Sequence, residues 1–179
     1  DVIGDVPLGI NVLRNDGRAA IAIAAAVDAR FVRINVLTGA RVTDQGIIEG
    51  DAANVLRDRA TLGATEVEVW ADVDVKHSAP LARRPIDEEV ADTLHRGGAA
   101  ALIVSGGGTG LATDPEHLAS VKRAAGSAPV LIGSGATAAN VGEYRDHAAG
   151  FIVGTSLKPS PTATVDVARV RAVADVLLA

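Results

Sequence analysis

The 179-residue sequence has no cysteine and no methionine, and it has only two Phe, one Tyr and one Trp. Without cysteine, the chain forms no disulfide framework, thiolate metal site or cysteine nucleophile. The few aromatics and the net charge of −5 argue against a nucleic-acid module, which needs stacking platforms and a basic stripe. The longest uncharged stretch, residues 124–142, contains Pro129 and four glycines, so we predict no membrane span and expect a cytoplasmic protein.

Six short runs rich in Val and Ile predict buried strands. Each run is too continuous for a strand with one solvated face and too short for a helix. The predicted strands are 7–13, 31–37, 67–71, 101–104, 129–132 and 151–153. Segments with helical spacing lie between and after them, at 18–28, 48–62, 86–96, 115–125, 137–146 and 165–178.

This strict alternation, without hairpin signals, predicts an α/β fold with a parallel sheet and helical crossovers. An open doubly wound sheet is one architecture, but the turn after the first strand (residues 13–17, LRNDG) lacks its glycine-rich fingerprint. Glycines follow the last three strands instead, as in TIM-type barrels. An eightfold barrel of about 250 residues uses about 31 residues per unit. We therefore expect one incomplete barrel domain over 1–179, with about six βα units and the first two absent.

Two glycine-rich loops, after the last two predicted strands, carry the strongest local signal. Glycines let the backbone approach an anion, and successive N–H groups donate to phosphate oxygens. In barrels these two loops form a phosphate site, although either loop alone is explained by a tight turn. The predicted phosphate-binding residues are Gly133, Ser134, Gly135, Gly154, Thr155 and Ser156.

Polar residues at the other strand ends are candidates for catalysis, because the carboxyl ends of barrel strands face one pocket. Asp72 is either a general base whose pKa burial raises, or a carboxylate that caps the backbone or pairs with Lys76. Lys76 is an anion contact, a Schiff-base lysine or an exposed loop residue. Arg14 is a bidentate clamp on an anion or a partner of Asp16.

Other polar residues near these strand ends are candidate substrate contacts. The segment 38–46 suits a lid over the pocket, with a plain surface loop as the alternative. Asp72 and Asp74 are candidates for holding Mg²⁺ through water or a ligand phosphate. The candidate substrate-binding residues are Asn11, Asn15, Asn35, Asp44, His77 and Ser105.

Several of these segments together resemble the BtpA/SgcQ family. They are residues 9–16 (GINVLRND), 31–40 (FVRINVLTGA), 42–46 (VTDQG), 71–77 (ADVDVKH), 132–135 (IGSG) and 152–158 (IVGTSLK). The resemblance implies a phosphate-binding TIM-type barrel. Cyanobacterial members are linked to photosystem I biogenesis as peripheral thylakoid proteins, and other members are described as candidate nucleosidases or sugar-phosphate enzymes. The glycine run of 105–110 departs from the family pattern.

A barrel without two adjacent strands leaves apolar edges. We expect inward side chains such as Ile10 and Val12 to meet water, and closure to come from a longer product or a homo-oligomer. Two functions then remain open. One is an enzyme (lyase, hydrolase or isomerase) for a phosphorylated sugar or nucleoside-like molecule. The other is a non-catalytic assembly factor near a membrane, supported by family analogy alone.

Overall fold

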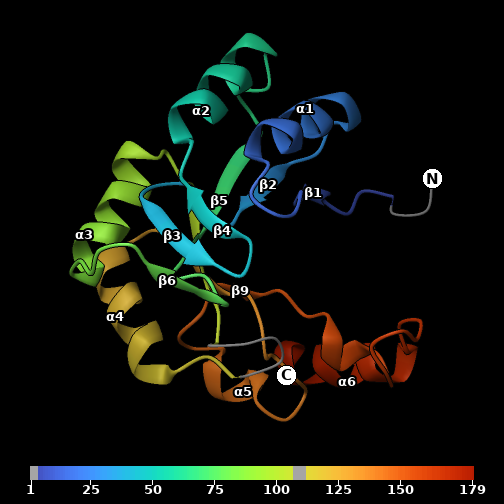
Figure 1. Ribbon diagram of the computed structural model, residues 1–179. Helices are drawn as coiled ribbons and strands as arrows, with labels where there is room; N and C mark the ends of the chain where they lie inside the picture. Colours follow the sequence, from blue (N-terminus) through green and yellow to red (C-terminus); the bar gives the residue numbers. More distant parts are fainter. Residues whose placement is uncertain (1–3, 107–111) are drawn as a thin grey trace.

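A six-stranded parallel sheet forms the centre of the computed structural model, which describes residues 4–106 and 112–179 (Figure 1). The strands follow one another across the sheet in chain order, as βα units with right-handed crossovers do. This confirms the predicted parallel sheet and all six of its strands. They are β1 (Gly9–Ile10), β2 (Phe31–Ile34), β5 (Glu68–Val73), β7 (Ala101–Val104), β8 (Val130–Ile132) and β9 (Gly150–Phe151).

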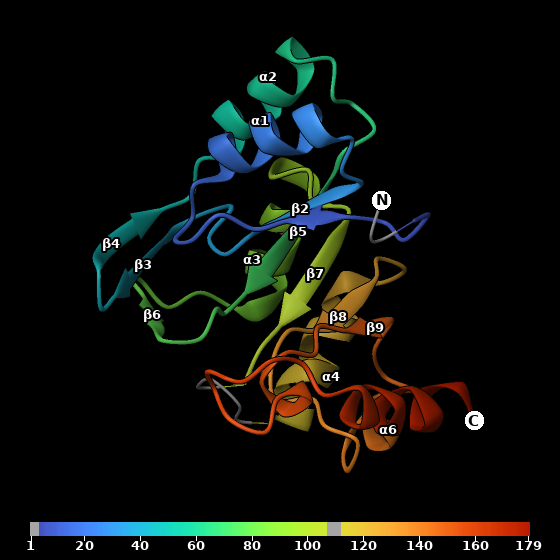
Figure 2. The same cartoon turned by 90° about the vertical axis from the view of Figure 1, so that its right-hand side faces the viewer.

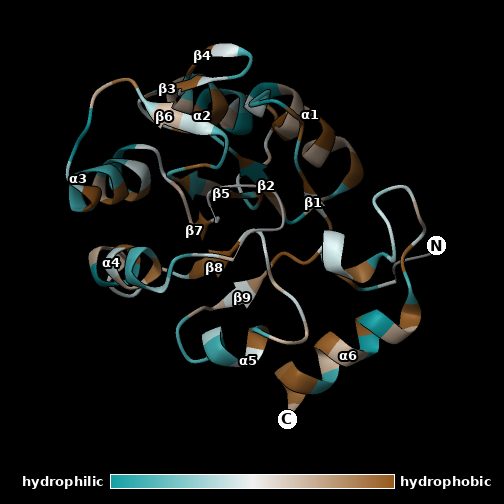
Figure 3. Ribbon diagram, turned by 60° about the horizontal axis from the view of Figure 1, so that its bottom comes forward, coloured by the Kyte–Doolittle hydropathy of each residue, from teal (hydrophilic) through white to brown (hydrophobic). Residues whose placement is uncertain are grey.

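The strands form an arc, and the helices lie on its outer side (Figure 3). The arc is open between β1 and β9, so the sheet is part of a barrel wall. The helices are α1 (Gly17–Val27), α2 (Ala52–Thr61), α3 (Ile86–Ala91, continued by a π-helical turn over Asp92–Arg96), α4 (Pro115–Ala125), α5 (Val141–Tyr144) and α6 (Val167–Leu178).

Strand side chains alternate between two apolar layers. The larger core lies between the sheet and the outer helices and contains Val32, Val69 and Leu102. A smaller cluster on the inner face contains Ala101, Ile103 and Leu131, with Trp70 and Ile152 packed against it. Phe31 and Trp70 stack with their ring centroids 3.8 Å apart. Burial on both faces explains why the strands have continuous apolar sequences.

A second, antiparallel sheet corrects the expectation of a fold without hairpins. It contains β3 (Ala40–Thr43), β4 (Gly46–Glu49) and β6 (Ser78–Pro80), in the order β4-β3-β6. The segment 38–46 is therefore largely an arm of a hairpin, and the helix predicted over 48–62 begins only at Ala52. The small sheet follows β2 and β5 in the chain and lies beside the carboxyl ends of these strands (Figure 2).

Two further expectations are wrong in detail. The helix predicted over 137–146 is shorter, because the Asn140 side chain accepts from the Thr137 N–H and donates to the Gly135 carbonyl, which holds the preceding segment as a loop. Ile10 and Val12 do not face the barrel interior. Both pack against the outer core, because the β1 register places them on the helix side of the sheet.

Replacement of one leucine on the outer face of β7 tests the outer core. Leu102 has no exposed surface. We expect Leu102→Ala to lower the free energy of unfolding by about 2–5 kcal/mol, because it removes buried methyl groups and leaves a cavity. Leu81, which is 59% exposed, provides the control. Leu81→Ala should change stability by less than about 0.5 kcal/mol in the same urea titration, and equal losses for the two variants would contradict this core.

Candidate functional site

The two glycine-rich loops at the carboxyl ends of β8 and β9 line one cavity of about 350 Å³. The Ser156 hydroxyl donates to the Ala136 carbonyl at 2.7 Å and thereby joins the two loops. Gly133 and Gly154 thus lie on the same cavity. All six predicted phosphate-binding residues, Gly133, Ser134, Gly135, Gly154, Thr155 and Ser156, line it; their binding role stays a prediction.

The loop after β8 presents unpaired backbone donors. Within the described ranges 4–106 and 112–179, the N–H groups of Ser134, Gly135 and Ala136 donate no hydrogen bond. Gly133 is required where this loop begins, because a Cβ there would lie 2.4 Å from Ile103 Cγ2 and 2.8 Å from Ser105 Oγ. Without a side chain at Gly133 the backbone lies close to β7, and the N–H groups that follow it are of the kind that bind anions.

A buried ion pair lies on the inner face of the sheet beside this loop. The Asp72 side chain on β5 is fully buried, and the Arg33 guanidinium on β2 donates to both of its carboxylate oxygens, at 2.8 and 2.9 Å. Asn35 donates to the same carboxylate at 2.8 Å, and its own Oδ1 has no partner in the described part of the chain. Burial raises the pKa of Asp72, although Arg33 opposes this shift.

The partner of Asp72 is therefore Arg33, and the predicted pairing with Lys76 is wrong. Our sequence interpretation assigned Arg33 no role. A signal was available, because Arg33 and Asn35 alternate on one face of an otherwise apolar strand. A Cβ placed on Gly133 would also lie 3.2 Å from Arg33 Nη2, so the guanidinium lies beneath the loop after β8.

Lys76 lines the cavity from the loop after β5. Among the residues that the structure describes, no group forms a hydrogen bond or an ion pair with its ammonium. Burial lowers the pKa of Lys76, and the nearby Arg33 and Arg14 guanidiniums lower it further, whereas Asp72 raises it. Lys76 is thus only partly exposed, contrary to the alternative of a solvated loop lysine.

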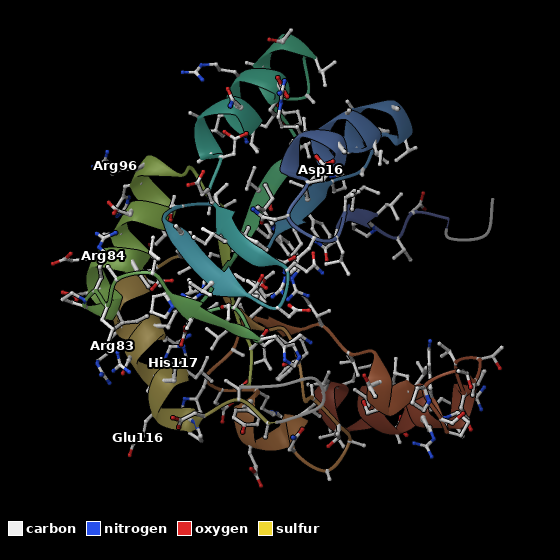
Figure 4. The ribbon with its side chains drawn as sticks, viewed as in Figure 1. Asp16, Arg83, Arg84, Arg96, Glu116 and His117 are labelled. Atoms are coloured by element: carbon white, nitrogen blue, oxygen red, sulfur yellow. The ribbon has the colours of Figure 1, made fainter. Side chains whose placement is uncertain are left out.

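One of the two alternatives for Arg14, an ion pair with Asp16, is wrong. The Arg14 guanidinium donates to the Asp44 carboxylate at 2.8 Å and to the Lys76 carbonyl at 2.9 Å. Asp16 instead caps α1, where it accepts from the Ala19 N–H (Figure 4). Arg14 therefore connects the tip of the β3–β4 hairpin to the loop that carries Lys76.

Some of the remaining predicted site residues lie near the cavity, and others hydrogen-bond to the backbone of β2 and the segment that follows it. Asn11 donates to the Arg33 carbonyl, and Asn15 binds both backbone groups of Val36, so their side chains hold β2 rather than face the cavity. The Ser105 hydroxyl is buried and unpartnered in the described chain, next to Gly133. His77 is exposed on the Lys76 loop. Of the predicted 105–110 loop, residues 107–110 lie outside the described residues.

The two carboxylates considered for Mg²⁺ bind different arginines. Asp74 pairs with the buried Arg41, which also lies 3.5 Å from Glu89. In the described ranges, no group of three or more His, Asp or Glu side chains could hold a metal ion. Both carboxylates are thus already paired with guanidiniums, which does not fit a role as Mg²⁺ ligands. His117, to which we assigned no role, lies with Nε2 3.9 Å from Asp74.

Comparison with known sequences identifies the family. The model of the BtpA family matches residues 2–178. The chain belongs to the BtpA family. It is 49% identical over 152 residues to the Photosystem I biogenesis protein BtpA of Synechocystis, covering 85% of this chain and 53% of the relative. An uncharacterized protein of Thermococcus kodakarensis is 47% identical over 153 residues, covering 86% and 57%. This BtpA-family chain spans little more than half the length of these relatives.

Solved structures confirm the barrel-type fold. Phosphoribosyl anthranilate isomerase from Thermococcus kodakaraensis superposes with a TM-score of 0.62 at 15% identity, covering 98% of this chain and 76% of that chain. At this identity the likeness establishes the fold alone. Within the described residues, no helix is long and apolar enough to cross a membrane.

Removal of Arg33 tests the buried pair. We expect Arg33→Met to lower the free energy of unfolding by about 3 kcal/mol at pH 7, because it leaves the Asp72 carboxylate buried without its cation. The loss should shrink between pH 7 and pH 5. Without Arg33 the pKa of Asp72 in the folded variant rises further above its value in the unfolded chain. As the pH falls, the folded variant therefore takes up a proton first, and the neutral carboxyl is less unfavourable in the buried site.

Urea unfolding at both pH values measures this difference. Arg57→Met is the matched control, since Arg57 is exposed on α2 and, in the described part of the chain, its side chain hydrogen-bonds to Asn54 alone; it should change stability by less than about 0.5 kcal/mol. A loss for Arg33→Met that is the same at pH 5 and pH 7 would show that Asp72 does not carry the effect.

Proposed function

We propose that this BtpA-family chain supplies the phosphate-binding part of a barrel enzyme that acts on a phosphorylated sugar or nucleoside-like molecule. The observation that carries the proposal is the single cavity lined by two glycine-rich loops and Lys76. Its volume of about 350 Å³ lies within the range of small-molecule sites. The unpaired N–H groups of the loop after β8 are the donors that a phosphate group needs.

Each side chain then has a role consistent with its surroundings. The backbone of Ser134, Gly135 and Ala136 binds phosphate oxygens, and the protonated form of Lys76, which lines the same cavity, supplies a positive charge. We assign the acid/base role to Asp72, whose pKa burial raises and Arg33 lowers; with Arg33 it lies beside the loop after β8, behind the cavity wall. Arg33 and Asn35 hold the Asp72 carboxylate in one orientation, which is a requirement for proton transfer.

A role as an assembly factor is the second candidate, and one observation favours it. The relative that is 49% identical is named as a Photosystem I biogenesis protein. Peripheral membrane association and a homo-oligomer belong to this proposal as well. A non-catalytic scaffold does not require an ion pair buried beside a cavity, however, because burying two charges is unfavourable unless each is compensated. The Arg33–Asp72 pair therefore favours the enzyme.

A negative charge placed in the cavity tests phosphate binding. Thr155 is exposed on the cavity wall. We expect Thr155→Glu to weaken the binding of ribose 5-phosphate and inorganic phosphate by about tenfold or more, because like charges repel at short range. Isothermal titration calorimetry measures both ligands.

Thr162→Glu is the matched control, since Thr162 is exposed and lies outside the cavity. It should bind both ligands like the unchanged chain. If the unchanged chain binds neither ligand, or if the two variants lose affinity equally, the cavity is not a phosphate site.

A further inference from the structure

We propose that Lys76 forms an imine with the carbonyl group of an open-chain phosphorylated sugar, so that the cavity performs covalent carbonyl chemistry. The inference rests on the proposed phosphate site and adds to it a reaction class and a nucleophile. It depends on the position of Lys76, on the absence of an ion-pair partner for its amine among the residues that the structure describes, and on the charges around it.

Only one lysine of this chain lines the cavity. The sequence contains three, Lys76, Lys122 and Lys158. Lys122 lies exposed on α4, outside the sheet, and Lys158 follows the short 3-10 helix Thr155–Leu157 without lining the cavity. Lys76 shares the cavity wall with both loops. A sugar held there by its phosphate therefore has its carbon chain within the same small volume as this amine.

The amine of Lys76 is not consumed by an ion pair. No carboxylate oxygen of the described residues lies within 4.0 Å of its nitrogen. Asp72 is the carboxylate whose charge acts on Lys76, and its oxygens are already bound by Arg33 and Asn35. A lysine that only stabilised the fold would be expected to pair with a carboxylate, whereas a nucleophilic lysine needs its lone pair available.

The surroundings also favour the neutral amine. Partial burial disfavours the ammonium, and the Arg33 and Arg14 guanidiniums repel it, so the pKa of Lys76 is lowered. Desolvation and neighbouring cations are the two means by which enzymes activate lysine nucleophiles. Arg14 also holds the backbone in place, because it donates to the Lys76 carbonyl. The loop thus presents a nucleophile of defined position to the cavity.

The reaction balances with the groups present. The lone pair of the neutral amine attacks the carbonyl carbon, a C–N bond forms, and the carbonyl oxygen takes up a proton as the nitrogen loses one. The hydroxyl of the resulting carbinolamine then takes a proton and leaves as water, which gives a protonated imine. Solvent water in the open cavity carries these protons, because the Asp72 carboxylate is buried and both of its oxygens are bound by Arg33 and Asn35. The protonated imine withdraws electrons from the adjacent carbon and so favours C–H or C–C cleavage there.

Reductive trapping tests the imine. The full chain is incubated at pH 7 with glyceraldehyde 3-phosphate and sodium cyanoborohydride, and the three lysines are followed by peptide mass spectrometry. We expect Lys76 to be labelled about tenfold faster than Lys122 or Lys158, because phosphate binding concentrates the carbonyl beside it. Unphosphorylated glyceraldehyde should lose this preference, and excess inorganic phosphate should suppress it.

Variants separate chemistry from binding. Lys76→Arg keeps the positive charge and should abolish the adduct while phosphate still binds, whereas Lys122→Arg should leave labelling at Lys76 unchanged. Thr155→Glu retains the lysine and should reduce its labelling to the rate of Lys122. Equal labelling of all three lysines, or none at Lys76, overturns the imine if calorimetry still detects phosphate binding. If the unchanged chain does not bind phosphate, the proposed function is overturned, and this inference with it.

Discussion

The hydrogen-bonded ion pair between Arg33 and Asp72 is the interaction on which the arrangement of the site depends. It joins β2 to β5 on the inner face of the sheet, where a carboxylate with no exposure would be unfavourable without its cation. The guanidinium lies beneath Gly133, so the pair also fixes where the loop after β8 begins. Its two charges act in opposite directions on Lys76. The Arg33–Asp72 pair thus connects β2 with β5, lies against the loop after β8 and influences the charge of Lys76.

The small antiparallel sheet serves the same site from outside the barrel wall. Arg41 on β3 is buried and pairs with Asp74, two residues before Lys76. Arg14 reaches the tip of the hairpin at Asp44 and the carbonyl of Lys76. Two arginines from different segments thus hold the loop between β5 and β6, which explains how a loop outside the main sheet keeps a defined position.

The order of the strands and the two glycine-rich loops could be predicted because they depend on local patterns. Continuous apolar runs indicate strands covered on both faces, and glycines after β8 and β9 follow from the barrel layout. The hairpin was missed because its strands are short and lie largely at the surface, so they have no apolar run. Arg33 was missed for a related reason, since one charged residue in an apolar strand looks like an edge residue until its partner is known.

The sequence by itself determined the fold class and the family, and it pointed to the two glycine-rich loops and Lys76, because strand periodicity, turn glycines and motifs are properties of neighbouring residues. Only the tertiary structure decided the partners. Asp72 bound Arg33 rather than Lys76, and Arg14 bound Asp44 rather than Asp16. These pairs join residues 39 and 30 positions apart. Spacing along the chain does not encode which charges meet, because that depends on strand register and on which face each side chain takes.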